Sequence, residues 1–352
     1  MIKASIIGIT GYTGLELLRL LLAHPKVEIK YLTSRQHAKE PIGKIYPHLA
    51  HLDLLVTNTV PEKVAKDSDV VFLCLPHKTA QDVVAALHGK TKIIDLSADF
   101  RLDDAATYKK YYEEHKYPAL LKKVVYGAPE VGYTASIKKA STVANPGCFA
   151  FLGQLLLYPF KDNIKQADIF AVTGSSGAGK SPGDGTHHPV RNHNMKSYNI
   201  NKHRHIPEIT RSAGITEKQL NFVPTSGPFT RGIFAQGFVT LKTPLSPRRK
   251  PGSGKRQPDP GFRRDDALMA VVEKAYSKAP FVRIQSEVAL ANIVGSNFVD
   301  LSFIEGTDGK ILVQGALDNI VKGAGGSAVQ NMNLMFGLKE TEGLIDLAPL
   351  YP

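Results

Sequence analysis

The feature that most constrains this chain is its start, where an apolar run passes through three glycines into an amphipathic helix. Residues 4–9 are typical of a buried strand, and apolar positions recur with helical period over residues 15–23. Glycines tighten such a turn and let its N–H groups approach a phosphate at the helix N-terminus. The spacing is G-x-x-G-x-x-G, so the strand–turn–helix context carries the interpretation. It predicts a dinucleotide site that includes Gly8, Thr10, Gly11, Tyr12, Thr13 and Gly14; a purely structural turn is the alternative.

Strand and helix patterns alternate through the first 146 residues, which predicts a parallel, doubly wound sheet. We expect strands over Ala4–Ile9, Glu28–Leu32, Val70–Leu75, Lys92–Leu96 and Ala140–Val143, and helices over Leu15–Ala23, Val60–Lys66 and Thr79–His88. After residue 148 the expected elements are a helix over Phe149–Tyr158 and longer strands over 168–173, 219–223, 233–241, 299–305 and 310–316. We therefore predict an α/β protein with a Rossmann-type domain over 1–146, completed by a C-terminal helix within 322–352. A second domain of α+β type with a mixed sheet is expected over 147–321.

Composition narrows the class of protein. No apolar run reaches the ~18 residues of a membrane span, and two cysteines in 352 residues build no disulfide framework, which favours a cytoplasmic enzyme. The formal net charge is +12, and residues 245–266, with seven Lys/Arg and three Asp, contribute +4. Four prolines and the lack of any apolar period predict a mobile basic insertion there. A nucleic-acid-binding arm is the alternative, but no aromatic interleaving accompanies the charge, so we expect neither a nucleic-acid nor a membrane partner.

The end of the second predicted strand bears on the choice of dinucleotide. An NAD site would offer an acidic residue there to hold the ribose 2′-hydroxyl. This chain has Thr33, Ser34 and Arg35 instead. A hydroxyl and a guanidinium suit a 2′-phosphate, so Ser34 and Arg35 favour NADP as cofactor. Arg35 as a solvated surface charge is the alternative.

One of the two cysteines is placed as a nucleophile would be. Cys148 follows Asn145-Pro146-Gly147 and opens the helix expected over 149–158. Unpaired N–H groups and the helix dipole at that position favour a thiolate. Cys74 lies within an apolar strand and is expected to be inert packing.

The acid/base partner of a cysteine nucleophile is expected among the histidines. The densest run is Lys202-His203-Arg204-His205, where one histidine serves as acid/base and the flanking cations hold an anion. A metal site at His203 and His205, or at His187 and His188, is the alternative, but no second ligand cluster has zinc-like spacing, so no metal is expected.

Residues 174–181, Gly-Ser-Ser-Gly-Ala-Gly-Lys-Ser, match the P-loop pattern of nucleoside triphosphatases after an expected strand. A P-loop also needs a helix that begins near the Lys-Ser pair, and Pro182-Gly183-Asp184-Gly185 is typical of a loop. A nucleoside triphosphatase is thus disfavoured. The free amides of this segment, at Ser176 and Gly177, are expected to help shape a cofactor pocket.

Taken together, these motifs resemble those of the N-acetyl-γ-glutamyl-phosphate reductases of arginine biosynthesis, within the wider aspartate-semialdehyde dehydrogenase-like group. The resemblance runs nearly end to end, through residues 8–14, 95–101, 145–148, 174–180, 203–208 and 318–323. It implies NADPH-dependent reduction of an acyl phosphate through a thioester on Cys148, and a homodimer or homotetramer built through the second domain's sheet. Aspartyl phosphate and a carrier-linked aminoadipyl phosphate remain alternative substrates. Two departures from the pattern are the 245–266 insertion and Asp99, where a small residue is expected.

The resemblance also implies roles for individual residues. His205 is the expected acid/base, with His203 as the alternative, and Arg101 is expected to hold the phosphoryl group. His203, Arg204 and Arg231 are candidates for the substrate's carboxylate or phosphate, and Asn319 is expected at the cofactor.

Overall fold

Seven short strands form one parallel sheet in the first part of the chain. The computed structural model describes residues 1–245 and 266–349. Helices cover both faces of this sheet, so β4 is buried at every residue. The strand order is β3 (Val56–Thr57), β2 (Val27–Thr33), β1 (Ile2–Ile7), β4 (Val70–Leu73), β5 (Lys92–Asp95), β7 (Thr142–Ala144) and β6 (Val125–Tyr126), and each pairing is parallel. The predicted doubly wound sheet is confirmed.

The direction of the strand order reverses between β1 and β4, and ligands of such sheets bind at the carboxyl ends of the strands beside that point. The glycine turn after β1 lies there and leads into α1. The helices of this part are α1 (Tyr12–Leu22), α2 (Ile42–Ile45), α3 (Pro61–Asp67), α4 (Ala80–Leu87), α5 (Ala105–Tyr111), α6 (Pro118–Leu121) and α7 (Thr134–Lys139).

A second, mixed sheet of seven strands follows. Its order is β12 (Val282–Ile284), β13 (Val299–Glu305), β14 (Lys310–Leu317), β11 (Ile233–Leu241), β8 (Ile164–Thr173), β10 (Leu220–Ser226) and β9 (Lys196–Ser197). The β8–β10 and β12–β13 pairs are parallel, and the others are antiparallel. This confirms the predicted mixed sheet.

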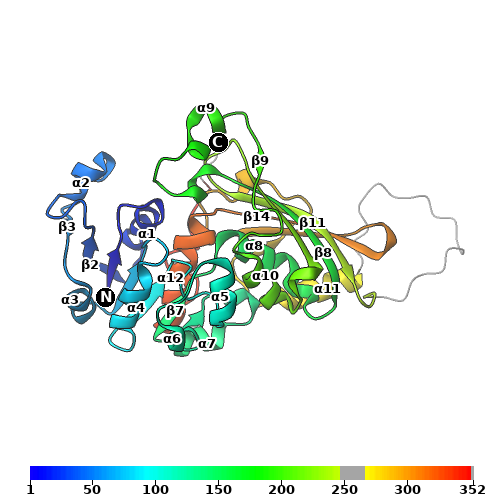
Figure 1. Cartoon of the computed structure of the whole chain (residues 1–352), viewed down its shortest axis with the longest axis horizontal. Coiled ribbons are helices and arrows are strands. Elements are labelled where there is room, and N and C mark those ends of the chain that lie inside the picture. The colour runs from blue at the N-terminus through cyan, green and yellow to red at the C-terminus, as the bar shows by residue number, and fades with distance from the viewer. Residues whose placement is uncertain (246–265, 350–352) are drawn as a thin grey trace, which may run out of the picture.

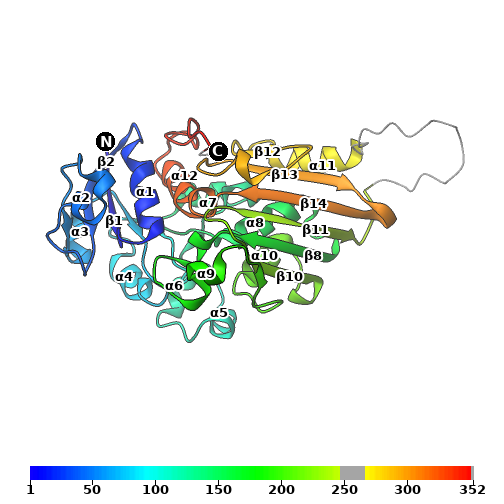
Figure 2. The same cartoon turned by 90° about the horizontal axis from the view of Figure 1, so that it is seen from above.

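Helices cover one face of the mixed sheet (Figures 1 and 2). They are α8 (Cys148–Leu157), α10 (Ile206–Ala213) and α11 (Asp266–Tyr276). From Phe149 to Leu157 every residue of α8 is buried, because the helix packs between this sheet and the rest of the molecule. The opposite face of the sheet carries exposed aromatic side chains, Phe170 on β8 and Phe238 on β11.

The end of the chain returns to the first sheet, as Figure 2 shows for α12 (Gly326–Met335) beside α1. Val329 and Met332 of α12 belong to the same core as Leu17 of α1. A π-helical turn, Val321–Gly325, precedes α12. Within it Lys322 is fully buried, and its Nζ lies 2.6 Å from Glu130 Oε1. This ion pair joins the π-helical turn to Glu130, which lies in the connection after β6.

Most expected elements lie within a few residues of the observed ones, and the strands over 233–241 and 299–305 agree at both ends. Residues 246–265, most of the expected basic insertion, lie outside the described residues. Within residues 1–245 and 266–349, no helix is both long and apolar enough to span a membrane.

Candidate active site

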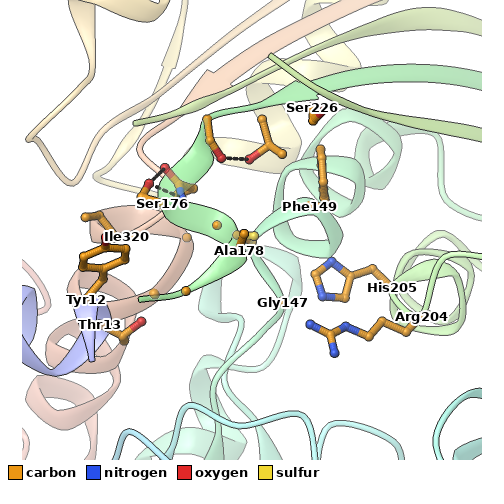
Figure 3. A pocket seen from close by; sticks show the side chains of 18 of the residues that line it. Tyr12, Thr13, Gly147, Phe149, Ser176, Ala178, Arg204, His205, Ser226 and Ile320 are labelled. Carbon is orange, nitrogen blue, oxygen red and sulfur yellow. Dashed lines mark hydrogen bonds between the residues drawn. The ribbon is translucent and has the colours of Figure 1, made fainter. Parts of the chain in front are cut away.

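A cleft of about 960 Å³ lies between the two sheets. It brings together the glycine turn, the turn after β5, the start of α8, the 174–180 segment and the 202–205 run. In Figure 3, Tyr12 and Thr13 face Ser176 and Ala178, while Arg204 and His205 lie at the other end, with the His205 ring directed toward Gly147. The sequence motifs, far apart along the chain, therefore share one site.

The described lining of this cleft is strongly basic. Its only acidic side chain is Asp184, and its Lys and Arg residues are Arg101, Lys180, Arg191, Lys196, Lys202 and Arg204. Such a concentration of cations raises the local concentration of anions. The cleft is therefore suited to phosphate-bearing ligands.

The glycine turn fits a phosphate group. Gly8 has a φ of +97°, and a Cβ on Gly14 would lie 2.6 Å from the Gly8 carbonyl oxygen, so neither position accepts a side chain without strain. A Cβ on Gly11 would meet nothing within 4 Å, which leaves the approach to the turn open. No side chain caps the first turn of α1. The Thr10 carbonyl accepts a hydrogen bond from the Tyr46 hydroxyl at 2.8 Å, which steadies the turn.

Ser34 and Arg35 follow β2 directly, next to this turn. The Thr33 carbonyl accepts a hydrogen bond from the Gly8 N–H at 3.0 Å, and the Ser34 N–H donates to the Thr57 carbonyl. Arg35 is exposed, and neither it nor Ser34 lines the cleft itself. They follow the end of the second strand, whose last residue bonds the glycine turn.

Ser176, Gly177 and Asn319 line the cleft opposite α1. The Asn319 side-chain amide donates to Ser176 Oγ at 2.9 Å, and its Oδ1 accepts from the Gly232 N–H at 2.6 Å. Asn319 therefore fixes the segment after β8. Residues 175–178 form a 3-10 turn and no helix begins at Lys180, so the second element that a P-loop needs is missing.

Cys148 is the first residue of α8, and Gly147 is the N-cap. A Cβ on Gly323 would lie 2.8 Å from Cys148 Cβ, so the π-helical turn packs directly against the cysteine. Burial raises the pKa of the Cys148 thiol, while Arg101, the Phe149 N–H and Arg204 act in the opposite direction. The net direction is upward because the loss of hydration on burial is the largest contribution.

The His205 imidazole packs against Gly147. A Cβ on Gly147 would lie 2.7 Å from His205 Cε1 and closer still to Nε2. Burial, followed by His203 and Arg101, holds the pKa of His205 well below 6.5, so the ring is neutral at pH 7. Its Nδ1 has no hydrogen-bond partner in the described part of the chain. The neutral imidazole thus carries an unprotonated ring nitrogen next to Gly147, the residue before Cys148.

Arg101 is presented into the cleft by a well-bonded turn. Its Nε donates to the Asn145 carbonyl at 2.8 Å and its Nη2 to the Leu96 carbonyl at 3.0 Å. Asp95, whose pKa burial raises to about 7, accepts two hydrogen bonds from Ser97 in the same turn. The guanidinium is therefore held in place through Nε and Nη2, while its Nη1 faces Glu208 Oε1 at 3.8 Å.

Glu208 is a site residue to which we assigned no role from the sequence. Its Oε2 accepts hydrogen bonds from the Gly147 N–H at 3.0 Å and the Tyr126 hydroxyl at 2.7 Å, and its Oε1 lies 3.8 Å from Arg101 Nη1. The available signal was its place three residues after His205, on the same side of a helix. Glu208 fixes the turn that presents Cys148.

The other expected substrate residues separate into two groups. His203 and Arg204 line the cleft, and the His203 ring lies edge-on to His205 with centroids 4.6 Å apart. Arg231 is not brought into the lining, contrary to its expected role, because two carboxylates already bind it. Its Nη2 lies 2.9 Å from Asp318 Oδ2 and 3.2 Å from Glu16 Oε1, which joins the second sheet to α1.

Asp99, the unexpected residue of the turn after β5, is fully buried and has a structural use. Its Oδ1 accepts hydrogen bonds at 3.0 Å from the Lys78 N–H and from the Tyr108 hydroxyl. These bonds tie the turn that carries Arg101 to the segment after β4 and to α5. His77, which lines the cleft and accepts a hydrogen bond from the Ala98 N–H, was not singled out from the sequence; burial lowers its pKa to about 3.

Comparison with known proteins agrees with this geometry. Residues 3–140 match the NAD-binding domain of semialdehyde dehydrogenases, and residues 148–251 match the dimerisation domain of semialdehyde dehydrogenases. The chain belongs to the semialdehyde dehydrogenase family. The two matched regions divide where α8 begins, at the candidate nucleophile.

Several curated relatives match this chain over its whole length. The N-acetyl-gamma-glutamyl-phosphate reductase of Desulfotalea psychrophila is 39% identical over 100% of both chains. The putative LysW-L-2-aminoadipate/LysW-L-glutamate phosphate reductase of Thermococcus kodakarensis is 37% identical, again over 100% of both. The resemblance to the N-acetyl-γ-glutamyl-phosphate reductases is thereby confirmed, and the chain is an enzyme with an NAD(P)-binding domain.

Solved structures support the same fold. An aspartate semialdehyde dehydrogenase with NADP from Candida albicans superposes with a TM-score of 0.68 at 14% identity, covering 96% of this chain and 98% of that one. At this identity the likeness is one of fold alone.

Proposed function

We propose that this protein catalyses the NADPH-dependent reduction of N-acetyl-γ-glutamyl phosphate to N-acetylglutamate 5-semialdehyde and phosphate, in arginine biosynthesis. The observation that carries the proposal is the meeting of Cys148, His205 and Arg101 around Gly147, at one end of a basic cleft whose other end is the glycine turn. Relatives of the same name at 39% identity support the choice of substrate.

The cofactor would be held by the glycine turn from Gly8 to Gly14 on one side and by Ser176, Gly177 and Asn319 on the other. Ser34 and Arg35, at the end of β2, would receive the 2′-phosphate that distinguishes NADPH from NADH. When bound, NADPH supplies the hydride that reduces an acyl group to an aldehyde. The open space beside Gly11 and the uncapped start of α1 support this placement.

The covalent chemistry belongs to Cys148. The neutral His205 imidazole accepts the thiol proton, and the sulfur then attacks the acyl carbon, so that the C–S bond forms as phosphate leaves. Arg101, fixed by two backbone carbonyls, holds the phosphoryl group and stabilises the charge that develops on it. The enzyme is left as a thioester on Cys148.

His205 is proposed to act first as general acid and then as general base during the reduction. As the thioester oxygen becomes an alkoxide, the imidazolium returns its proton to that oxygen, and the resulting thiohemiacetal is neutral. The imidazole then removes the proton again as the C–S bond breaks and the aldehyde leaves. His203 and Arg204 are proposed to bind the substrate's α-carboxylate, since both line the cleft beside His205.

A homodimer or homotetramer is proposed to form through the mixed sheet. Its uncovered face carries Phe170, 51% exposed, and Phe238, 45% exposed, on the adjacent strands β8 and β11. Aromatic side chains are enriched at protein interfaces. The proposed nucleophilic thiol needs a reducing environment, so we propose that the protein is cytoplasmic. We also propose that the boundary between the two domains lies between residues 146 and 147.

The test is phosphate-dependent reduction of NADP with N-acetylglutamate semialdehyde, compared with aspartate semialdehyde and carrier-linked aminoadipate semialdehyde. We expect the first substrate to have the highest kcat/KM, and the third is the second candidate because relatives named for it are 37–38% identical. Cys148→Ala should abolish turnover and retain NADPH binding. Near-normal turnover by Cys148→Ala would refute the mechanism, and a clear preference for another aldehyde would refute the substrate.

A further inference from the structure

Lys180 belongs to the 174–181 segment that matches the P-loop pattern, and the mechanism above makes no use of it. Its side chain is exposed and lines the cleft together with Gly11 and Tyr12 of the glycine turn. Its Nζ lies 5.1 Å from the centroid of the Tyr46 ring. No carboxylate of the described residues forms an ion pair with it. Lys180 is therefore a cation directed at the glycine turn from the opposite sheet.

The backbone around Lys180 places it there. The N–H groups of Gly174, Ser175 and Ser176 donate to carbonyls of the β10–β11 connection at 2.9 to 3.0 Å. Gly179 has a φ of +84°, a conformation that glycine adopts readily and other residues rarely do. The segment is thus anchored at its start and redirected just before the lysine.

Tyr46 connects the lysine to the turn. Its hydroxyl donates to the Thr10 carbonyl at 2.8 Å, while its ring receives the Lys180 ammonium. An ammonium over an aromatic ring is attracted by the ring's negative face. Tyr46 therefore contacts both the glycine turn and Lys180.

We propose that Lys180 binds the pyrophosphate of the nicotinamide dinucleotide, and that Tyr46 is its positioning residue. The inference rests on the proposed use of a dinucleotide at the glycine turn. The site differs from a P-loop because the lysine comes from the second sheet and the phosphate-binding turn from the first. A dinucleotide bound between them would link the two halves of the cleft.

The pyrophosphate is common to NADPH and NADH, whereas the 2′-phosphate belongs to NADPH alone. The experiment measures the Kd of each nucleotide by isothermal titration calorimetry with the full-length, substrate-free protein. We expect Lys180→Met to raise both Kd values by about tenfold, the size of one charge-assisted hydrogen bond. Lys180→Arg should recover most of the affinity. Lys218→Met, at an exposed lysine outside the cleft lining, is the matched control.

Tyr46 tests the positioning role. Tyr46→Leu should raise both Kd values roughly two- to threefold, and its effect should be smaller when it is added to Lys180→Met, because only the hydrogen bond to the Thr10 carbonyl is then left to lose. Equal effects of Tyr46→Leu in both backgrounds would refute the positioning role.

The outcomes separate the two proposals. Unchanged Kd values for Lys180→Met, with normal NADPH-dependent turnover, would overturn the Lys180 proposal and leave the function intact. A rise for NADPH alone would assign the lysine to the 2′-phosphate and refute the pyrophosphate contact. Failure of the unmodified protein to bind either nucleotide would refute both proposals.

Discussion

Gly147 offers the sharpest test of the site, because its hydrogen atom faces the acid/base histidine. Its φ of −70° and ψ of 141° are open to any residue, so alanine carries no backbone penalty there. The added Cβ, however, would lie 2.7 Å from His205 Cε1 and 2.8 Å from Arg101 Nη1. The effect of Gly147→Ala is therefore purely steric and acts on two proposed catalytic groups.

Neither neighbour can move away freely. His205 is 5% exposed and lies against His203, with ring centroids 4.6 Å apart, and Arg101 is bonded to two backbone carbonyls. Restoring normal contact requires a displacement of roughly 1 Å, which costs catalysis on the order of 100-fold. That loss corresponds to about 2.7 kcal/mol of transition-state stabilisation. Overpacking should also lower the free energy of unfolding by about 1–3 kcal/mol.

The assay is kcat/KM for phosphate-dependent NADP reduction, with thermal unfolding recorded on the same samples. Gly183→Ala is the matched control, since its Cβ would come no closer than 4.0 Å, to Thr186 Oγ1. We expect kcat/KM to fall about 100-fold for Gly147→Ala and to stay within about twofold for the control. A Gly147→Ala enzyme that is folded and within about threefold of normal kcat/KM would refute the steric argument.

Three further predictions follow from the structure. Burial raises the pKa of the Cys148 thiol, so the rate of its alkylation by iodoacetamide in the ligand-free protein, mapped by mass spectrometry, should level off at a higher pH than the alkylation of free cysteine; a plateau at the same or a lower pH would contradict this. Arg35→Asp should move the ratio of kcat/KM for NADPH over NADH toward NADH by about tenfold or more, the scale of one charge-assisted hydrogen bond, whereas an unchanged ratio would leave Arg35 a surface charge. Lys322→Met leaves the buried Glu130 carboxylate without its cation and should lower the free energy of unfolding by about 3–5 kcal/mol, measured by urea titration. Adding Glu130→Gln to this variant should restore part of the lost stability. A loss below about 1 kcal/mol for Lys322→Met would argue against a buried ion pair.

Local patterns predicted most of the long elements of this fold, but they missed the eight-residue α10 and most of the shortest elements. The strand over 233–241 alternates buried and accessible residues, a signal contained within its own sequence. The two-residue strands β3, β6 and β9 carry no such signal, since each exists only through pairing with a neighbour. The same distinction separates the site residues that we expected from those that we did not.

The glycine turn and the Cys148 turn were predictable because a few adjacent residues define each of them. The role of Glu208 was not, because it bonds the Gly147 N–H across 61 residues of sequence. The ion pairs that keep Arg231 out of the cleft lining are made with Asp318, 87 residues away, and with Glu16, 215 residues away. The local sequence does not distinguish an arginine that binds a ligand from one that forms a structural ion pair, because the partner carboxylates are distant in the chain.

The sequence alone determined the alternation of strands and helices, the glycine turn after the first strand and the cysteine at the start of a helix, because each depends on residues near one another in the chain. Only the tertiary structure decided how these parts meet and which protonation states their side chains have. Cys148 has the helix terminus that favours a thiolate, yet burial raises the pKa of its thiol. His205, a residue that titrates near neutrality in water, is held neutral by the same burial and by the cations around it. Hydration is lost only when distant segments pack together, so the protonation states on which the chemistry depends belong to the fold.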